Sequence, residues 1–152
     1  MEDCEKKLDE TIQKKQRERE KNKQEEKECE VKQEANRKKA ISFISDTVAP
    51  AVARATEQMH NHDIFATWER SGNDGTSVSI EAHKQGINIP RDQIFEYRID
   101  MYYDPHRIEP HIQCLYKGNH NIKDNVQISE INEEDIYNDV WGRFINFAEI
   151  KL

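Results

Sequence analysis

The sequence predicts an α+β fold. A long charged N-terminal helix, or partly disordered arm, leads into a small domain in which an N-terminal and a C-terminal helix cover an antiparallel sheet of four or five strands. Residues 2–40 contain no glycine or proline and are rich in Glu, Lys, Gln and Arg, which favour helix. Several stretches between residues 65 and 116 alternate apolar with polar side chains, the period of half-buried strands. We therefore divide the chain into an arm, residues 1–40, and a domain, residues 41–152.

The arm has the composition of a helix but no apolar face. Residues 14–28, KKQREREKNKQEEKE, contain no apolar side chain, and only Leu8 and Ile12 make an apolar turn before Cys29. A coiled coil needs apolar residues at its seam over several heptads, so a stable zipper is excluded. We expect a solvated helix, or a segment that becomes helical next to a partner, serving as a spacer or as a docking element.

The domain is acidic and the arm is nearly neutral. Residues 1–40 carry 13 basic and 12 acidic side chains, whereas residues 41–152 carry 10 basic and 18 acidic ones, a net charge of −8. Phosphate contacts drive binding to nucleic acids, so such a domain is expected to repel them. The arm, with its basic side chains, keeps nucleic-acid binding open as an alternative.

A helical apolar spacing continues from the arm into the domain. Pro50 interrupts it, because proline has no N–H and its ring clashes with the carbonyl one turn earlier. We expect a long helix with a kink or short break near Asp46. The apolar positions are Ile41, Ile44, Val48, Ala51, Ala55 and Met59.

MHNHD, residues 59–63, resembles a metal-binding stretch only superficially. On a helix, side chains two residues apart point to nearly opposite sides, so His60 and His62 cannot converge on one ion. We interpret this stretch as the C-terminus of the helix, with Asn61 suited to the left-handed conformation that ends many helices.

Four strands with their turns follow. Residues 65–70 and 77–83 predict a hairpin around Gly-Asn-Asp-Gly, and the alternation in DQIFEYRIDMYYD is the strongest strand signal in the chain. Asp104-Pro105-His106-Arg107 predicts a type I turn into the strand IEPHIQCLYK. Pro110 places that strand at an edge or delays its start.

The last part of the chain predicts a loop and a helix. GNHNIKDN has the composition of a loop, and residues 125–128 are a candidate fifth strand. Ser129 or Asn132 then caps a helix that begins with three acidic residues, which suit the positive end of the helix dipole. Its broad apolar face is expected to serve the core, with homodimerisation as an open alternative. That face comprises Ile136, Tyr137, Val140, Trp141, Phe144 and Phe147.

Two groups of side chains in the sheet are candidates for chemistry. Glu96, Arg98 and Asp100 share one strand face, and His111 and Gln113 of the next strand are expected opposite them. A salt-bridged solvent face and an acid–base or metal site both fit this pattern. A second candidate, for a metal-dependent hydrolase or nuclease, lacks any recurrent ligand spacing. It comprises His106, Glu109, His111 and His120.

Familiar enzyme motifs are absent from the sequence. It has no phosphate-binding glycine loop, no G-x-S-x-G and no H-E-x-x-H, and Cys114 falls on the apolar side of its strand. We therefore expect a non-enzymatic protein-interaction module without a cofactor, whose partner is another protein with a basic surface. Within that class, an acidic inhibitor or adaptor of a basic, nucleic-acid-handling protein is the sharper hypothesis. The candidate partner-binding residues are Lys14, Lys15, Arg17, Arg19, Glu96 and Asp100.

The cysteines and the hydropathy indicate the compartment. Cys4, Cys29 and Cys114 show no C-x-x-C spacing, so free thiols in a reducing environment are expected. No apolar run is long enough to span a membrane, and the N-terminus lacks the pattern of a signal peptide. These features predict a cytoplasmic location without membrane contact.

Overall fold

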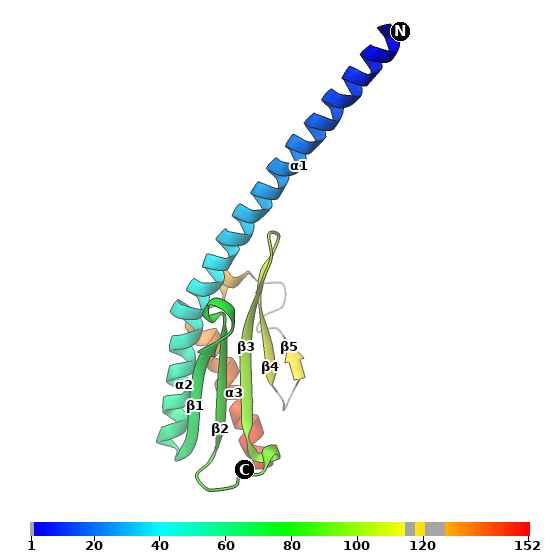
Figure 1. Ribbon diagram of the computed structural model, residues 1–152. Helices are drawn as coiled ribbons and strands as arrows, with labels where there is room; N and C mark the ends of the chain where they lie inside the picture. The colour runs from blue at the N-terminus through cyan, green and yellow to red at the C-terminus, as the bar shows by residue number, and fades with distance from the viewer. Residues whose placement is uncertain (1, 115–117, 121–126) are drawn as a thin grey trace.

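The computed structural model describes residues 2–114, 118–120 and 127–152, and it confirms the α+β fold (Figure 1). A long helix leads into a five-stranded antiparallel sheet, and a C-terminal helix follows. The elements are α1 (Glu2–Phe43), a π-helical turn (Ile44–Val48), α2 (Ala49–Asn61), β1 (Ile64–Ser71), β2 (Ser77–Lys84), β3 (Phe95–Tyr103), β4 (Ile108–Cys114), β5 (Gly118–His120) and α3 (Glu133–Lys151).

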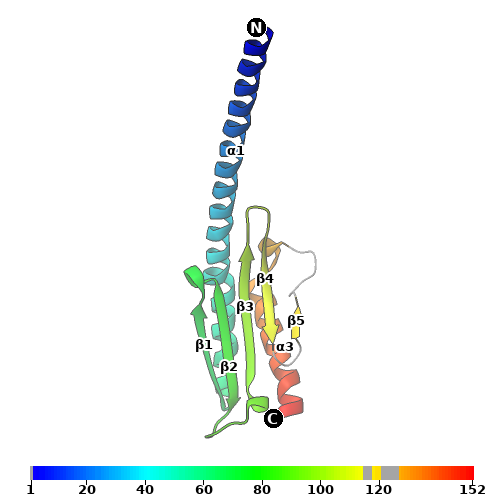
Figure 2. The same cartoon turned by 45° about the vertical axis from the view of Figure 1, so that its right-hand side comes forward.

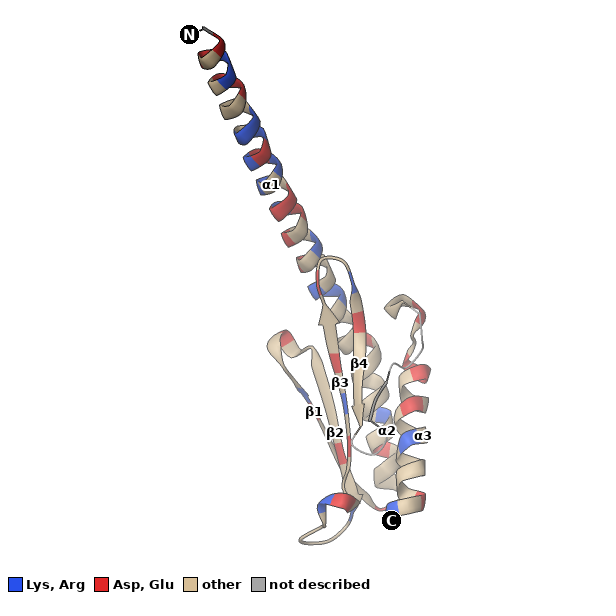
Figure 3. Cartoon of the chain, turned by 90° about the vertical axis from the view of Figure 1, so that its right-hand side faces the viewer, with Lys and Arg blue, Asp and Glu red and all other residues tan. Residues whose placement is uncertain are grey.

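The sheet is a simple meander, and α2 and α3 cover one of its faces. Each strand pairs antiparallel with the next in the order β1-β2-β3-β4-β5 (Figure 2). Both α2 and α3 pack on the same side of the sheet, and α1 runs past the sheet away from the domain (Figure 3). Among the described residues, no helix covers the opposite face of the sheet.

The predicted break before Pro50 is a π-helical turn. The N–H of Ala49 reaches back five residues to the carbonyl of Ile44. Pro50 has no N–H to donate to Asp46 one turn earlier, and a wider turn at this point lets the helix continue without the ring clash. Ile44 and Val48, both within the turn, are fully buried, so the break also serves the core.

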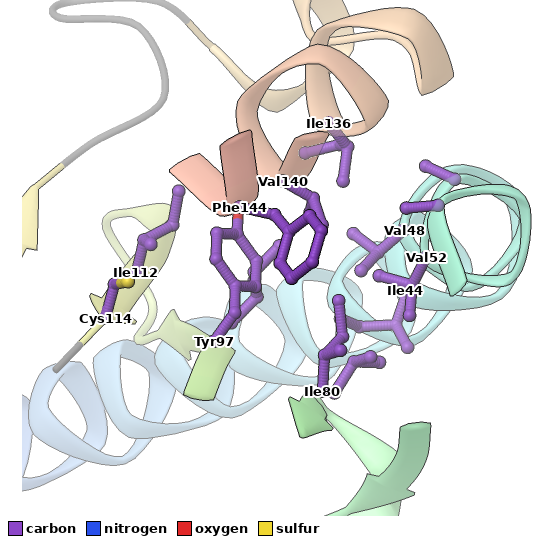
Figure 4. Close-up of a cluster of buried hydrophobic side chains, with 14 of the residues drawn as sticks. Ile44, Val48, Val52, Ile80, Tyr97, Ile112, Cys114, Ile136, Val140 and Phe144 are labelled. Atoms are coloured by element: carbon purple, nitrogen blue, oxygen red, sulfur yellow. The ribbon is translucent and has the colours of Figure 1, made fainter. Parts of the chain in front are cut away.

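The core fills the space between the helices and the inner face of the sheet (Figure 4). Phe95 of β3 packs edge-on against Phe144 of α3, with ring centroids 5.4 Å apart. Asn132 caps α3 as one of the two predicted residues, and it exchanges hydrogen bonds with Asp135 in a capping box. The side chains labelled in Figure 4 are Ile44, Val48, Val52, Ile80, Tyr97, Ile112, Cys114, Ile136, Val140 and Phe144.

Several local predictions need correction. Helix α2 ends at Asn61 as expected, but the left-handed residue is Asp63, with φ 60°. Within GNHNIKDN, where a loop was expected, Gly118–His120 forms β5. The candidate strand at 125–128 lies partly outside the described residues, and Ile128 begins a 3₁₀ turn.

The strand that contains Pro110 begins without delay, at Ile108. Pro110 pairs with Met101 of β3, and β5 pairs only with Ile112–Cys114. In the described part of the chain, Pro110 therefore has a neighbouring strand on one side only, which is the environment that proline tolerates in a sheet.

Candidate interaction surfaces

The uncovered side of the sheet is a polar surface, here called the open face. Side chains alternate between the two faces along a strand, so the residues between the core positions of β1–β4 point away from the helices. Eleven residues line a hollow of about 670 Å³ on the sheet. The open face is defined by Thr67, Glu69, Ser79, Glu81, Glu96, Arg98, Asp100, His111 and Gln113.

Three carboxylates, those of Glu69, Glu81 and Glu96, line this hollow. Glu81 of β2 is directly opposite Glu96 of β3, and Glu69 of β1 is in the adjacent strand. Among the residues that the structure describes, none of the three makes a hydrogen bond or ion pair. Like charges directly opposite each other across a sheet are destabilising, so the fold tolerates a repulsion at this place.

The predicted cluster on β3 and β4 forms as a salt-bridged solvent face. Arg98 Nε lies 2.9 and 3.0 Å from the two carboxylate oxygens of Asp100, which also accepts a hydrogen bond from Ser77 Oγ. Asp100 is directly opposite His111, and Arg98 is directly opposite Gln113. Asp100 is thus already engaged by its neighbours, whereas Glu96 stays available to a partner.

The structure does not assemble the candidate metal ligands. Glu109 Oε1 lies 3.4 Å from His111 Nε2, but Arg107 Nη1 lies 3.5 Å from the same oxygen. The Arg107 guanidinium therefore occupies the position beside Glu109 where a metal ion would bind. His106 is exposed in the β3–β4 turn, and only the backbone of His120 falls within the described residues. Across residues 2–114, 118–120 and 127–152 no group of three or more His, Cys, Asp or Glu is placed to hold a metal ion.

The histidines of MHNHD also have separate environments. His60 Nε2 lies 2.7 Å from the carbonyl oxygen of Ala66 in β1, which identifies Nε2–H as the donor. The ring of His62 lies 5.9 Å from that of Trp141 on α3. Both imidazoles therefore hold the end of α2 against its neighbours.

The candidate basic residues of the arm lie on an exposed helix. Every side chain from Asp3 to Ala35 is exposed, over about 50 Å of helix at 1.5 Å per residue. Lys14 and Arg17 are on one side of α1, while Lys15 and Arg19 are on the other, because each residue turns the helix by roughly 100°.

Contacts with two hairpins fix the base of the arm. Asn36 Nδ2 donates to the backbone carbonyl of Asp104, 2.7 Å away in the β3–β4 turn. Arg37 Nη1 lies 3.2 Å from Asp74 in the β1–β2 turn. Arg70 of β1 donates to Ser45 Oγ at 2.8 Å, just beyond the end of α1. The direction in which the arm leaves the domain is therefore set by tertiary contacts.

The β3–β4 turn is itself held by a carboxylate. Asp104 Oδ1 accepts hydrogen bonds from the backbone N–H groups of His106 and Arg107, at 2.7 and 2.9 Å. These bonds, the one from His106 above all, lower the pKa of Asp104 below its ordinary value. The same residue that shapes the turn thus presents its carbonyl to Asn36.

A buried polar network, which the sequence analysis did not predict, links α3 to the sheet. Tyr97 donates its hydroxyl proton to Asp139 Oδ2 at 2.6 Å, and Arg143 Nε lies 3.2 Å from the same oxygen. Burial raises the pKa of Tyr97 well above its ordinary value. The i, i+4 spacing of Asp139 and Arg143 was the available signal, but that spacing is also common on exposed helix faces.

Comparisons of the chain with protein-family models, with curated proteins and with solved structures found no match. Among the described helices, none is both long enough and apolar enough to cross a membrane.

Proposed function

We propose that this chain is a non-enzymatic protein-interaction module whose open face binds a basic surface of another protein. The observation that carries the proposal is that Glu81 lies opposite Glu96, beside Glu69, and that among the described residues none of the three pairs with a cation. Arg98 lines the same hollow but is bound to Asp100. A Lys or Arg side chain from a partner would remove the repulsion between the two carboxylates, and charge complementarity would favour encounter.

The charge of the domain supports the same class of partner. Residues 41–152 carry a net charge of −8, so a basic protein is attracted from a distance and a nucleic acid is repelled. An acidic inhibitor or adaptor that occupies a basic, nucleic-acid-handling protein fits this charge. The arm adds reach, because its base is fixed and its exposed part extends about 50 Å from the domain.

The thiols support a reducing compartment. All three cysteines are free, with Cys4 and Cys29 exposed on the arm and Cys114 buried in β4. Exposed free thiols are typical of cytosolic proteins, and we place the module in the cytoplasm.

Affinity capture from cytosol tests the proposal. The full chain serves as bait, and bound proteins are identified by mass spectrometry. A basic protein retained near stoichiometrically by the wild type, and lost on the double substitution Glu81→Gln and Glu96→Gln, is the expected result. The matched control is Glu57→Gln with Glu149→Gln, which removes the same charge from exposed positions on α2 and α3. Capture that is equal for all three baits, or absent from all, contradicts the proposal.

A further inference from the structure

One side of the arm combines apolar and basic side chains. Leu8, Ile12, Lys15, Arg19 and Lys23 recur at three- and four-residue spacing, so they form a single stripe along α1. Leu8 and Ile12 are 59% and 45% exposed, among the most exposed large apolar side chains in the described part of the chain. This set is called the arm stripe below.

The arm stripe cannot reach the open face of its own chain. Helix α1 is continuous from Glu2 to Phe43, and its contacts with the hairpins begin only at Asn36. Lys23 therefore lies about 20 Å along the helix from the first of these contacts. The arm runs away from the sheet (Figure 1), so an acidic surface that binds the stripe must belong to another molecule.

The open face is complementary to the arm stripe in charge and in apolar character, and the two surfaces have similar lengths. On the same side of the sheet as the three glutamates of the open face, β1 also carries Phe65, which is 43% exposed and stacks on His83 at 4.9 Å. From Phe65 to Glu69 is about 13 Å along β1. From Ile12 to Lys23 is about 17 Å along α1. Apolar contact at one end and ion pairs at the other are thus available together.

We propose that the open face of one copy binds the arm stripe of a second copy. The two surfaces are complementary, because each combines an apolar end with a charged end and their charges have opposite sign. The inference rests on the proposed function, because both assign the open face as the binding site. It adds a mode of regulation, since self-association through the arm competes with a basic partner for the same carboxylates. If the two arms exchange, the dimer is closed; if they do not, the copies form an open chain.

A charge exchange in the full chain tests this contact directly. Variant A reverses the stripe with Lys15→Glu, Arg19→Glu and Lys23→Glu. Variant B reverses the open face with Glu69→Lys, Glu81→Lys and Glu96→Lys. Sedimentation velocity at low salt measures association of the wild type, of each variant alone and of an equimolar mixture of A and B, after circular dichroism has shown that each is folded.

The matched controls change the same number of charges elsewhere. Control A carries Lys14→Glu, Arg17→Glu and Lys21→Glu, on the opposite side of α1. Control B carries Glu57→Lys, Glu130→Lys and Glu149→Lys, outside the sheet. All of these side chains are exposed.

The wild type and both controls are expected to self-associate, and added salt is expected to weaken the association. Variants A and B alone are expected to associate at least about tenfold more weakly, since like charges then face each other. Their mixture is expected to regain the lost affinity. A monomeric wild type, controls that behave like A and B, or a mixture that stays dissociated overturns the inference. Glutamate-dependent capture of a basic protein would still support the proposed function in each of those cases.

Discussion

Asn36 and Asp104 are 68 residues apart in the sequence, and the side-chain amide of the first donates to the backbone carbonyl of the second at 2.7 Å. With the pair Arg37 and Asp74, this bond joins the arm to both hairpin turns at one end of the sheet. The position of Asn36 therefore marks where the arm leaves the domain.

Loss of these contacts is expected to loosen the arm. Asn36→Ala removes one part-buried hydrogen bond and is expected to lower the free energy of unfolding by about 0.5–1.5 kcal/mol. Combined with Asp74→Ala, it is expected to broaden the distance distribution between spin labels at Cys4 and at a cysteine placed at position 92, with Cys29 changed to serine. Gln24→Ala, in the exposed arm, is the control. An unchanged distribution in the double variant would show that the hairpins do not hold the arm.

Neutralising one carboxylate of the open face is expected to stabilise the domain. Glu81→Gln removes the repulsion from Glu96 and is expected to raise the free energy of unfolding by about 0.2–1 kcal/mol in urea titrations. Glu109→Gln is the contrast on the same face, because Glu109 has Arg107 and His111 beside it and no stabilisation is expected. A loss of stability in Glu81→Gln would mean that this carboxylate has a favourable partner.

The stability of the domain is expected to depend on both charges of the buried network, those of Asp139 and Arg143. Arg143→Met leaves the Asp139 carboxylate without its arginine in a buried place, and a cost of about 3–5 kcal/mol is expected. Adding Asp139→Asn to Arg143→Met is expected to recover part of that loss, because the carboxylate charge is then gone. Equilibrium urea unfolding measures both. A cost below about 1 kcal/mol for Arg143→Met would contradict the burial of this pair.

Acid is expected to weaken the β3–β4 turn. The folded protein holds the pKa of Asp104 below the ordinary value of 3.8, so its ionised form stabilises the turn above that pH. The contribution is lost as pH falls from about 3.8 through the lowered pKa. A carboxyl-carbon NMR titration is expected to place the midpoint for Asp104 below 3.8. A midpoint at or above that value would show that the backbone N–H groups of His106 and Arg107 do not bind the carboxylate.

The sequence was enough to predict which side chains share a face of the sheet, because side chains alternate between the two faces along each strand. The alternation in β3 placed Glu96, Arg98 and Asp100 together, and the short turn before β4 brought His111 opposite Asp100 as expected. The partner of Glu96 was not predictable. It depends on the register of β2 with β3, and the ten residues between these strands leave that register undetermined by local sequence.

The burial of Asp139 and Arg143 could not be predicted from the sequence either. Asp139 and Arg143 have the spacing of an exposed helix pair, and only the tertiary position of Tyr97 beneath α3 makes them interior. The short β5 was missed for a related reason. Three residues carry too little alternation to distinguish a strand from a loop.

The accessibility of the open-face carboxylates in the captured complex shows whether the partner binds at the open face. Carbodiimide labelling followed by mass spectrometry compares each glutamate in the free chain and in the complex, with Glu57 and Glu149 as references on the helical side. If the open face is the binding site, Glu81 and Glu96 lose labelling in the complex while Glu57 and Glu149 keep it. Equal labelling of Glu81 and Glu96 in both states would show that the partner binds elsewhere and that the open face is not the binding site.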